Sequence, residues 1–401
     1  MCRPPIVDSA DFSYLRTHHC FYIDKTDFLR EWWHRGSRVT LLLRPHGFGK
    51  TLAANTLARF FSSEYTDQNE LFSELSVWQD DKTRAAAGRY PVLSLSFADW
   101  TGTSFDKLLS NVRRYFLRLR EAHPFLTQSP LISETLHRFF SDFSEESSVA
   151  DIQYFLQWLC KALELHFGIK PIVILDDYDT PFLNAWHNHY AKDLAGFMDP
   201  LMGLTFRSTQ SLTRAVIFST TYGDWLDGID LADVVTSTNA KFATGFGFTE
   251  AEVSAGLQYC GLSDTNAVQK QYGGFSFGCS SHLCHPKSVA RYLSHQTFDH
   301  TDLADPLLET AVCEAYSLNS ASLLPQLRSL LSGKTLFTEI REPVTYSKLT
   351  SHPGNLFSLL VAYGIATIIE TENPVYRCRI TLPNEESRLT FRRLFSKHLC
   401  A

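Results

Sequence analysis

The sequence of 401 residues has no apolar run of the length that crosses a bilayer, which is about 20 residues. The longest apolar run, residues 357–369, is interrupted by Tyr363 and Gly364, and we expect it to be a buried element. Residues 1–12 contain Pro4 and Pro5 but no apolar core, so they do not form a signal peptide. We therefore expect no membrane association and an intracellular location, either cytoplasmic or nuclear.

An excess of positive charge is also missing. The 37 basic and 43 acidic residues give a formal net charge of -6, so there is no overall basic field that would attract a nucleic acid. Near the C-terminus, Arg388, Arg392, Arg393 and Lys397 recur at helical spacing, and we interpret them as a solvated helix face. A nucleic-acid partner thus stays an alternative that the charge does not support.

Paired cysteines are absent as well. The nine cysteines are odd in number and never form a CxxC pair, which is typical of reduced thiols inside a cell. Core-forming residues, in contrast, are plentiful: 44% of the chain is hydrophobic, and 30 residues are Phe. A chain of this length is expected to fold as two or three packed units.

Segments with the pattern of strands alternate with segments of helical pattern in the first half of the chain. The expected strands are residues 39–43, 91–97, 171–175 and 212–220, with a further short one at 234–235. The expected helices are residues 51–61 and 104–121, with a helix-rich insertion at 131–167. This alternation predicts an α/β fold with a mostly parallel, doubly wound sheet that binds its ligand beyond the carboxyl ends of the strands.

The pattern changes after Phe248. Thr249 and Glu252 form a capping box that opens a helix, and the region that follows is expected to be mainly helical. Short strands are expected at residues 364–369 and 376–381, among further helices. We predict three units: residues 1–248 as the nucleotide-binding domain, 249–320 as a helical, lid-like region, and 321–401 as a small winged-helix-like α+β unit.

The segment RPHGFGKT, residues 44–51, joins the first expected strand to the first expected helix, which is the context of a phosphate-binding P-loop, or Walker A motif. Lys50 would meet the β and γ phosphates, and Thr51 would place its hydroxyl on Mg²⁺. Arg44 replaces the usual first glycine, so an ordinary Gly-containing turn is the alternative. The residues expected to bind the nucleotide are Arg44, Pro45, His46, Gly47, Phe48, Gly49, Lys50, Thr51 and Leu52.

Two acids follow the expected central strand. Asp176 is the first of them and is the predicted metal ligand beside Thr51, and Asp177 is expected to orient or activate the attacking water. The predicted catalytic residues are therefore Asp177 and Lys50. An Asp-rich turn that caps the next helix is the alternative, and Asp179 with Thr180 would explain such a turn. After the next strand, Ser219, Thr220 and Thr221 offer either a polar sensor of the γ-phosphate or a plain turn.

In this order, these segments resemble the AAA-ATPase-like family of predicted P-loop ATPases, which are often fused to a C-terminal PD-(D/E)XK nuclease-like domain. The family's YVDKT and RPRRFGKT resemble YIDKT at residues 22–26 and RPHGFGKT at 44–51. The remaining matches cover most of the chain: LDDYDTP at 175–181, FGFTEAEV at 246–253, YGGFSFG at 272–278, PKSV at 286–289, which is similar to the family's NPWSI, and LPNEE at 382–386, which is similar to its IPNxEV. The resemblance implies ATP as the nucleotide and makes Arg44 an ordinary member of the loop.

Three departures from the family bear on activity. Asp177 stands where the family has Glu, which shortens the carboxylate by one methylene. Residues 219–224, STTYGD, lack the arginine of the family's TGITRVS-like segment. The chain ends at Ala401, just past its LPNEE segment, so no nuclease activity is expected.

We therefore expect an Mg²⁺-dependent ATP-binding protein that is a weak ATPase or a nucleotide-driven switch. A non-hydrolysing nucleotide-binding module is the main alternative, because of the short Asp177 and the missing arginine. A nucleic-acid-binding adaptor built on the C-terminal unit is a further one. The expected ligands are ATP and Mg²⁺, and a protein partner is expected without being identified; the sequence does not indicate an oligomeric state.

Overall fold

A computed structural model gives the structure of the protein and describes residues 9–223, 233–278, 280–298, 303, 306–317, 320–349, 351–372 and 377–396. Several residues named above, or at the ends of the ranges given there, lie outside the described residues: Pro4, Pro5, Asp224, Tyr376, Lys397 and Ala401. Among the residues that the structure describes, no helix has the length and apolar character that crossing a membrane requires.

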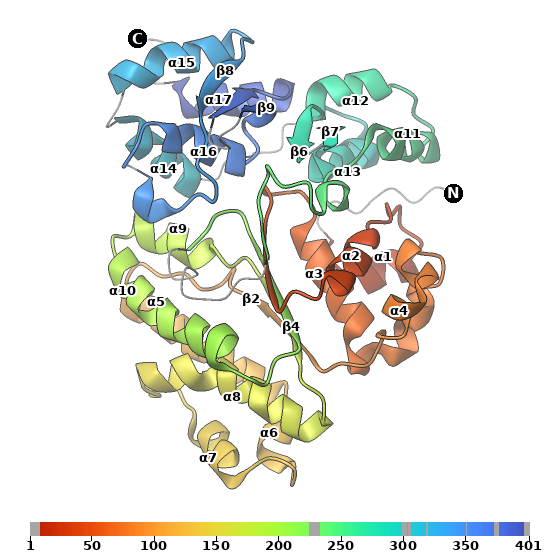
Figure 1. Ribbon diagram of the computed structural model, residues 1–401, viewed down its shortest axis with the longest axis vertical. Coiled ribbons are helices and arrows are strands. Elements are labelled where there is room, and N and C mark those ends of the chain that lie inside the picture. Colours follow the sequence, from red (N-terminus) through yellow and green to blue (C-terminus); the bar gives the residue numbers. More distant parts are fainter. Residues whose placement is uncertain are drawn as a thin grey trace.

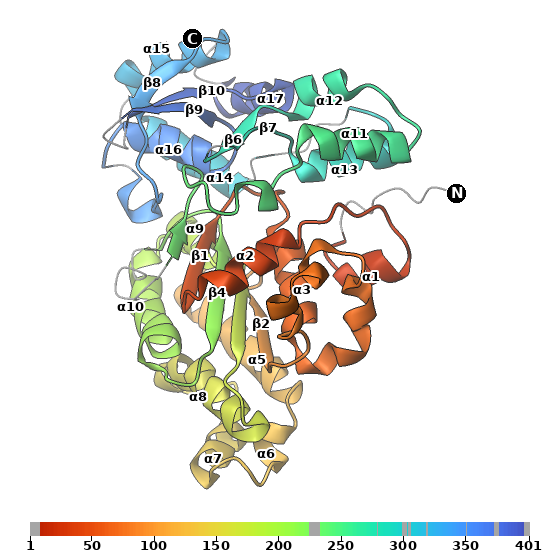
Figure 2. The ribbon, with the colours of Figure 1, turned by 45° about the vertical axis from the view of Figure 1, so that its right-hand side comes forward.

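The centre of the molecule is a five-stranded parallel sheet with the order β2-β3-β4-β1-β5 (Figures 1 and 2). All five strands coincide with segments predicted from the sequence, within a few residues at each end. Their bounds are Val39–Leu43 (β1), Val92–Ser96 (β2), Ile172–Asp176 (β3), Arg214–Ser219 (β4) and Asp233–Val235 (β5). The predicted α/β class with a parallel sheet is confirmed.

Helices cover both faces of this sheet, so the apolar residues of the central strands are buried on either side. One face carries α1 (Phe12–Thr17), α2 (Asp27–Arg35), α3 (Lys50–Phe61) and α4 (Asp81–Arg84), with two 3₁₀ segments at Ser63–Phe72 and Ser76–Gln79. The other carries α5 (Phe105–Glu121), α8 (Val149–Phe167), α9 (Thr180–His187) and α10 (Ala191–Met202), and α10 runs into a π-helical turn at Gly203–Ser208. The short α6 (Phe125–Gln128) and α7 (Glu134–Asp142) lie at the end away from the termini.

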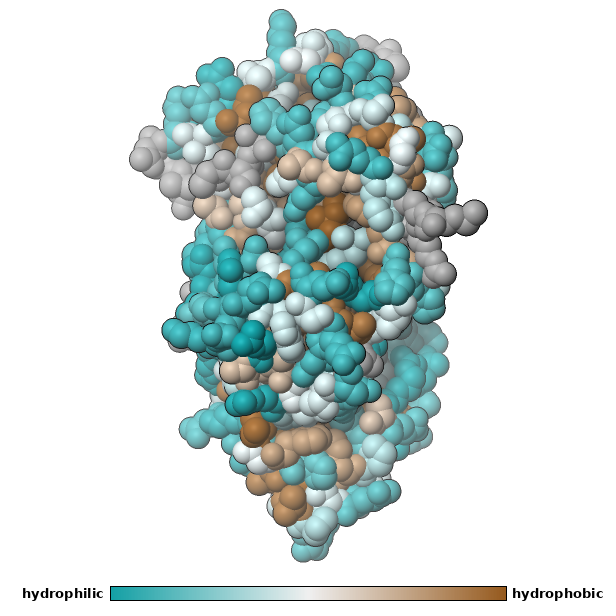
Figure 3. Space-filling model, turned by 90° about the vertical axis from the view of Figure 1, so that its right-hand side faces the viewer, coloured by the Kyte–Doolittle hydropathy of each residue, from teal (hydrophilic) through white to brown (hydrophobic). Residues whose placement is uncertain are grey.

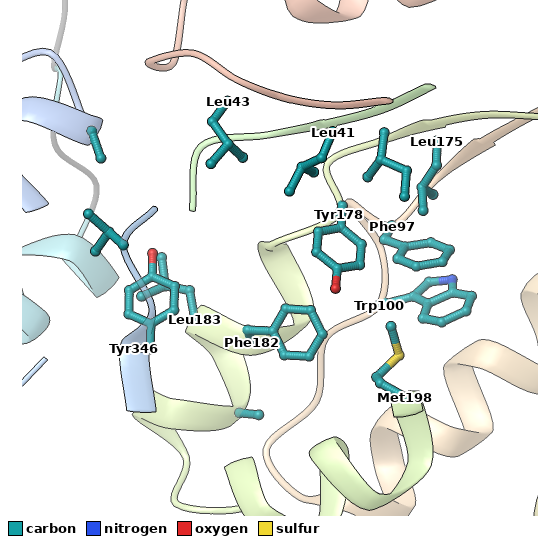
Figure 4. Close-up of a cluster of buried hydrophobic side chains, with 14 of the residues drawn as sticks. Leu41, Leu43, Phe97, Trp100, Leu175, Tyr178, Phe182, Leu183, Met198 and Tyr346 are labelled. Atoms are coloured by element: carbon teal, nitrogen blue, oxygen red, sulfur yellow. The ribbon is translucent and has the colours of Figure 1, made fainter. Parts of the chain in front are cut away.

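Alternation along the strands divides the core in two. Leu42 of β1 packs toward α2 and α3, while its neighbours Leu41 and Leu43 belong to the cluster on the opposite face. Figure 4 shows Leu41, Leu43 and Leu175 above the rings of Tyr178 and other aromatic residues. The same cluster continues without a break into the C-terminal part of the chain, so the sheet and that part share one core.

Residues 250–295 form a group of three helices with one hairpin, above the carboxyl ends of the strands (Figure 1). The elements are α11 (Glu250–Tyr259), α12 (Thr265–Tyr272), β6 (Phe275–Phe277), β7 (Ser280–Leu283) and α13 (Pro286–His295). The predicted capping box is present at Thr249 and Glu252. The hairpin was not predicted, because its strands are only three and four residues long and carry several small polar residues.

The C-terminal part contains a three-stranded antiparallel sheet with the order β8-β10-β9 and four helices. In chain order the elements are α14 (Pro306–Ser317), α15 (Ser320–Leu331), β8 (Leu336–Glu339), a 3₁₀ turn (Tyr346–Lys348), α16 (Gly354–Ala362), β9 (Thr367–Glu372), β10 (Arg377–Thr381) and α17 (Glu385–Leu394). Helix α14 packs against α15, α16 and α17, and also against α9 of the α/β part.

Candidate nucleotide-binding site

The segment predicted as a phosphate loop connects the end of β1 to the start of α3. Gly47 and Gly49 have φ angles of 79° and 86°, in the left-handed region that only glycine enters without strain. Gly49 is the residue before the helix, and α3 begins at Lys50. The first N–H groups of a helix have no intrahelical acceptor, so this loop presents donors and the positive end of a helix dipole to the space in front of it.

Lys50 is folded back onto its own loop. Its ammonium donates to the carbonyl oxygens of Arg44 and Pro45, at 2.6 and 3.0 Å, and to the Thr220 hydroxyl at the end of β4, at 3.2 Å. Burial lowers the pKa of Lys50, while the carboxylates of Asp179, Asp176 and Asp177 act in the opposite direction. The side chain is thus held between the loop and the acidic end of β3.

Arg44 is a buried side chain that anchors the loop. Its guanidinium donates to three carbonyl oxygens, those of Leu43, Thr236 and Lys241, at 2.8 to 3.1 Å. It also lies over the ring of Phe277, 4.7 Å from the ring centroid. Burial lowers the pKa of Arg44 to about 10, so it stays charged at neutral pH. An arginine in place of the first glycine therefore ties the loop to the segment that follows β5.

Asp176, the last residue of β3, has a buried carboxylate without a hydrogen bond. The residue is 4% exposed, and neither carboxylate oxygen has a hydrogen-bond partner among the described residues. Burial, together with repulsion from Asp177, raises the pKa of Asp176 to about 6, while the neighbouring Thr51 hydroxyl, the Lys50 charge and the Asp177 backbone N–H, none of them in good hydrogen-bond geometry, act in the opposite direction. A carboxylate in such a place is costly unless a cation or a donor compensates it.

The other two acids of the loop have partners. Asp177 adopts a φ of 52° and accepts a hydrogen bond from the Ser96 hydroxyl at the end of β2, at 2.8 Å. Burial raises the pKa of Asp177, and the bond from Ser96 opposes this. Asp179 accepts from the backbone N–H groups of Thr220 and Thr221, at 3.1 and 2.9 Å, and from the Thr221 hydroxyl. Asp179 thus fixes the end of β4 against the loop after β3.

These groups meet at a cavity of about 750 Å³. Seven of the nine predicted nucleotide-binding residues line it, from His46 to Leu52, and so does Asp177; Arg44, Pro45 and Asp176 are not in its wall. Further parts of its wall come from the N-terminal segment around Phe21, from residues 245–248 and from the start of α13. Figure 3 shows the face of the molecule above α1 and α3, where apolar atoms lie in a recess ringed by hydrophilic ones.

Comparison with known families agrees with this geometry. The family described as predicted AAA-ATPase matches residues 7–221, which is more than half of the chain. The chain belongs to this family. No curated protein matches the sequence. Membership of the predicted AAA-ATPases supports a nucleotide-binding, ATPase-like role, and the matched segment contains both the phosphate loop and the acidic loop.

Motif segments of this predicted AAA-ATPase meet at the cavity even where they are far apart in sequence. Lys25 of YIDKT donates to both carboxylate oxygens of Glu252 in the capping box, at 2.7 Å each, and to the Thr244 carbonyl. Asp24 of the same motif accepts from the Thr26 hydroxyl and from the backbone of Ser76. The N-terminal motif therefore holds the start of α11 beside the phosphate loop.

Three successive residues of the phosphate loop are covered by the β6 to α13 segment. The Phe48 ring lies edge-to-face against Phe275 and His285, with centroids 5.1 and 5.0 Å apart. The backbone N–H of Lys287 donates to the Gly47 carbonyl at 3.3 Å. His285 Nε2 lies 3.0 Å from the His46 carbonyl oxygen. The β6 to α13 segment thus packs directly on the phosphate loop.

His285 is also part of a buried polar chain. Burial lowers its pKa to about 4, so the imidazole is neutral; since a carbonyl only accepts, Nε2 carries the proton and donates to His46. Nδ1 accepts from the backbone N–H of Ser288, whose hydroxyl lies 2.7 Å from Nδ1 and 2.9 Å from both carboxylate oxygens of Glu386 in α17. This chain connects the phosphate loop to the C-terminal helix.

The sequence did not predict a role for Ser96, His285 or Lys287. It also did not predict that Asp179 accepts hydrogen bonds from the backbone of Thr220 and Thr221. Ser96 is the last residue of β2, which pairs with β3. Its position beside Asp177 follows from this pairing, and the sequence does not reveal which strands pair. Lys287 belongs to residues 286–289, which were matched by resemblance alone and given no role, and His285 directly precedes that segment. Among the described residues, no group of three or more His, Cys, Asp or Glu side chains could hold a metal by itself.

Proposed function

We propose that this predicted AAA-ATPase binds ATP with Mg²⁺ in the cavity between the phosphate loop and the acidic end of β3. The observation that carries the proposal is Asp176. Its buried carboxylate has no hydrogen-bond partner among the described residues and lies behind a loop that ends in Lys50 and Thr51. A nucleoside triphosphate with its bound cation supplies both the anion that the loop attracts and the positive charge that compensates the Asp176 carboxylate.

The two sides of the site would have separate tasks. Gly47, Gly49 and the start of α3 would hold the phosphates through backbone N–H groups, and Lys50 would exchange its present carbonyl partners for phosphate oxygens. The donor set fits Mg²⁺, because this ion takes oxygen ligands and needs only one or two from the protein. Thr51 and Asp176 would hold it, and it would neutralise phosphate charge.

Hydrolysis would depend on Asp177. Its raised pKa makes the carboxylate a better base, and the Ser96 hydroxyl keeps it in one orientation. Positioning and charge stabilisation supply most of the catalysis in phosphoryl transfer, so slow turnover requires few groups.

A non-hydrolysing module is the second candidate. Two features favour it. The hydrogen bond from Ser96 holds the Asp177 carboxylate toward β2, and the Asp177 side chain is one methylene shorter than the family's Glu.

The test is a titration of the purified protein with a fluorescent ATP analogue and Mg²⁺, beside the Lys50→Ala variant. We expect saturable binding that Lys50→Ala weakens by roughly tenfold to a hundredfold, because a charge-assisted contact is lost. Release of inorganic phosphate in the same samples then separates the two candidates. Absence of binding by the folded wild-type protein would refute the site altogether.

We further propose that the C-terminal part is a winged-helix-like unit. Its elements follow the order helix, helix, strand, helix and two strands before α17, and β9 and β10 form an antiparallel pair that would be the wing. The proposed division into residues 1–248, 249–320 and 321–401 places α11 to α13 as a lid over the cavity. Because α14 packs against α15, α16 and α17, the boundary between the second and third units would lie before α14 rather than at residue 320.

A further inference from the structure

Lys287 is the second residue of α13 and lies directly against the phosphate loop. Its backbone N–H donates to the Gly47 carbonyl at 3.3 Å. A Cβ atom added to Gly47 would be 3.4 Å from the Lys287 Cβ, so the lysine side chain starts within contact distance of the loop. Lys287 lines the cavity and is half-buried.

The backbone at this end of α13 has no donor left for a phosphate. Position one is Pro286, which has no N–H. The N–H of Lys287 is used by Gly47, the N–H of Ser288 by His285 Nδ1, and the N–H of Val289 by the His285 carbonyl. Apart from the helix dipole, the group at this end of α13 that could bind an anion in the cavity is therefore the Lys287 ammonium.

The carboxylates around the cavity would repel a triphosphate, and a further cation would offset this repulsion. Asp177 and Asp179 line the cavity, and the Asp176 carboxylate lies behind them, so a triphosphate enters a space with three nearby carboxylates. Of the described lysines that line the cavity, Lys25 is bound by Glu252, and Lys50 belongs to the phosphate loop itself. The third lysine that lines the cavity is Lys287, which comes from the α11 to α13 group.

We propose that Lys287 is a second phosphate-binding cation, which the α11 to α13 group contributes to the nucleotide site. The inference rests on the proposed function, since it names a further residue of the same site. The segment similar to the family's NPWSI has Lys287 where that motif has Trp. The chain lacks the arginine of the family's TGITRVS-like segment, and Lys287 would supply a positive charge to the cavity from α13.

The experiment compares four proteins in two titrations: the wild type, Lys287→Met, Lys287→Arg and Lys270→Met. Lys270 is the matched control, because it is an exposed lysine of α12 in the same group and does not line the cavity. One titration uses the fluorescent ATP analogue with Mg²⁺. The other displaces it with inorganic tripolyphosphate, which has no base or sugar and so reports on phosphate contacts alone.

Lys287→Met is expected to weaken both ligands by roughly tenfold to a hundredfold, the effect of removing one charge-assisted contact. Lys287→Arg is expected to restore most of the affinity, and Lys270→Met to leave it unchanged. Thermal melts check folding, and Lys287→Gln serves as a second neutral variant if the Met variant is unfolded.

Two results would overturn the proposal. One is wild-type affinity for tripolyphosphate in folded Lys287→Met; the other is an equal loss in Lys287→Arg, which would mean a role in packing. In either case the proposed function stands as long as Lys50→Ala weakens binding. If the wild-type protein binds neither ligand, both the function and the role of Lys287 are refuted.

Discussion

Replacing Asp176 by Asn should stabilise the ligand-free protein at neutral pH while removing its affinity for Mg²⁺ and nucleotide. The carboxylate is buried and lacks a hydrogen bond among the described residues, and its pKa is raised from 3.8 to about 6. A difference of this size corresponds to roughly 3 kcal/mol, at about 1.36 kcal/mol for each pKa unit. Asn has nearly the shape of the protonated acid and carries no charge at any pH.

The pH dependence of the difference follows from the direction of the shift. A carboxyl whose pKa is raised on folding favours the folded state when protonated, so its contribution is lost as the pH rises from about 4 through about 6. Wild type and Asp176→Asn should therefore be similarly stable at pH 4. Above pH 7 the variant should be more stable by up to roughly 3 kcal/mol.

Thermal melts across this pH range, without nucleotide, measure the difference. Asp179→Asn is the matched control on the same loop: the Asp179 carboxylate accepts three hydrogen bonds, so this variant should lose stability by about 1 to 3 kcal/mol. The reasoning is refuted if Asp176→Asn melts at or below the wild-type temperature at pH 7.5. A gain that persists unchanged at pH 4 would also contradict it.

Two further predictions concern the loops of the site. Gly47→Ala and Gly49→Ala should each cost about 1 to 2 kcal/mol from the left-handed backbone, but Gly47→Ala should melt lower, because its Cβ would lie 2.4 Å from His285 Nε2 while nothing lies within 4 Å at Gly49. Equal melting temperatures would mean that His285 moves aside without cost. Asp177→Glu should raise phosphate release by up to about a hundredfold, since an ångström of misplacement costs that much, and Asp177→Asn should abolish it. Slower release by the Glu variant would show that the shorter acid is already at the right distance.

The sequence predicted the elements of the sheet because the strands are short segments that are either continuously apolar, as in Val39–Leu43 and Ile172–Asp176, which are buried at every position, or alternating, as in Val92–Ser96. It also placed Lys50 and Asp176 at the same edge, since the carboxyl ends of parallel strands share one edge. What it left open depends on contacts between distant residues. The bond from Ser96 to Asp177 requires β2 to pair with β3, and no local pattern records that pairing.

The cover over the phosphate loop makes the parts of this protein interdependent. His46 touches a histidine 239 positions away along the chain, and that histidine leads on to Glu386. A segment that carried the strands and the phosphate loop alone would therefore expose the Phe48 ring and leave a carbonyl of the loop without its donor. Exchange of modules between relatives would have to preserve these contacts, so the phosphate loop, the α11 to α13 group and α17 are expected to be inherited together.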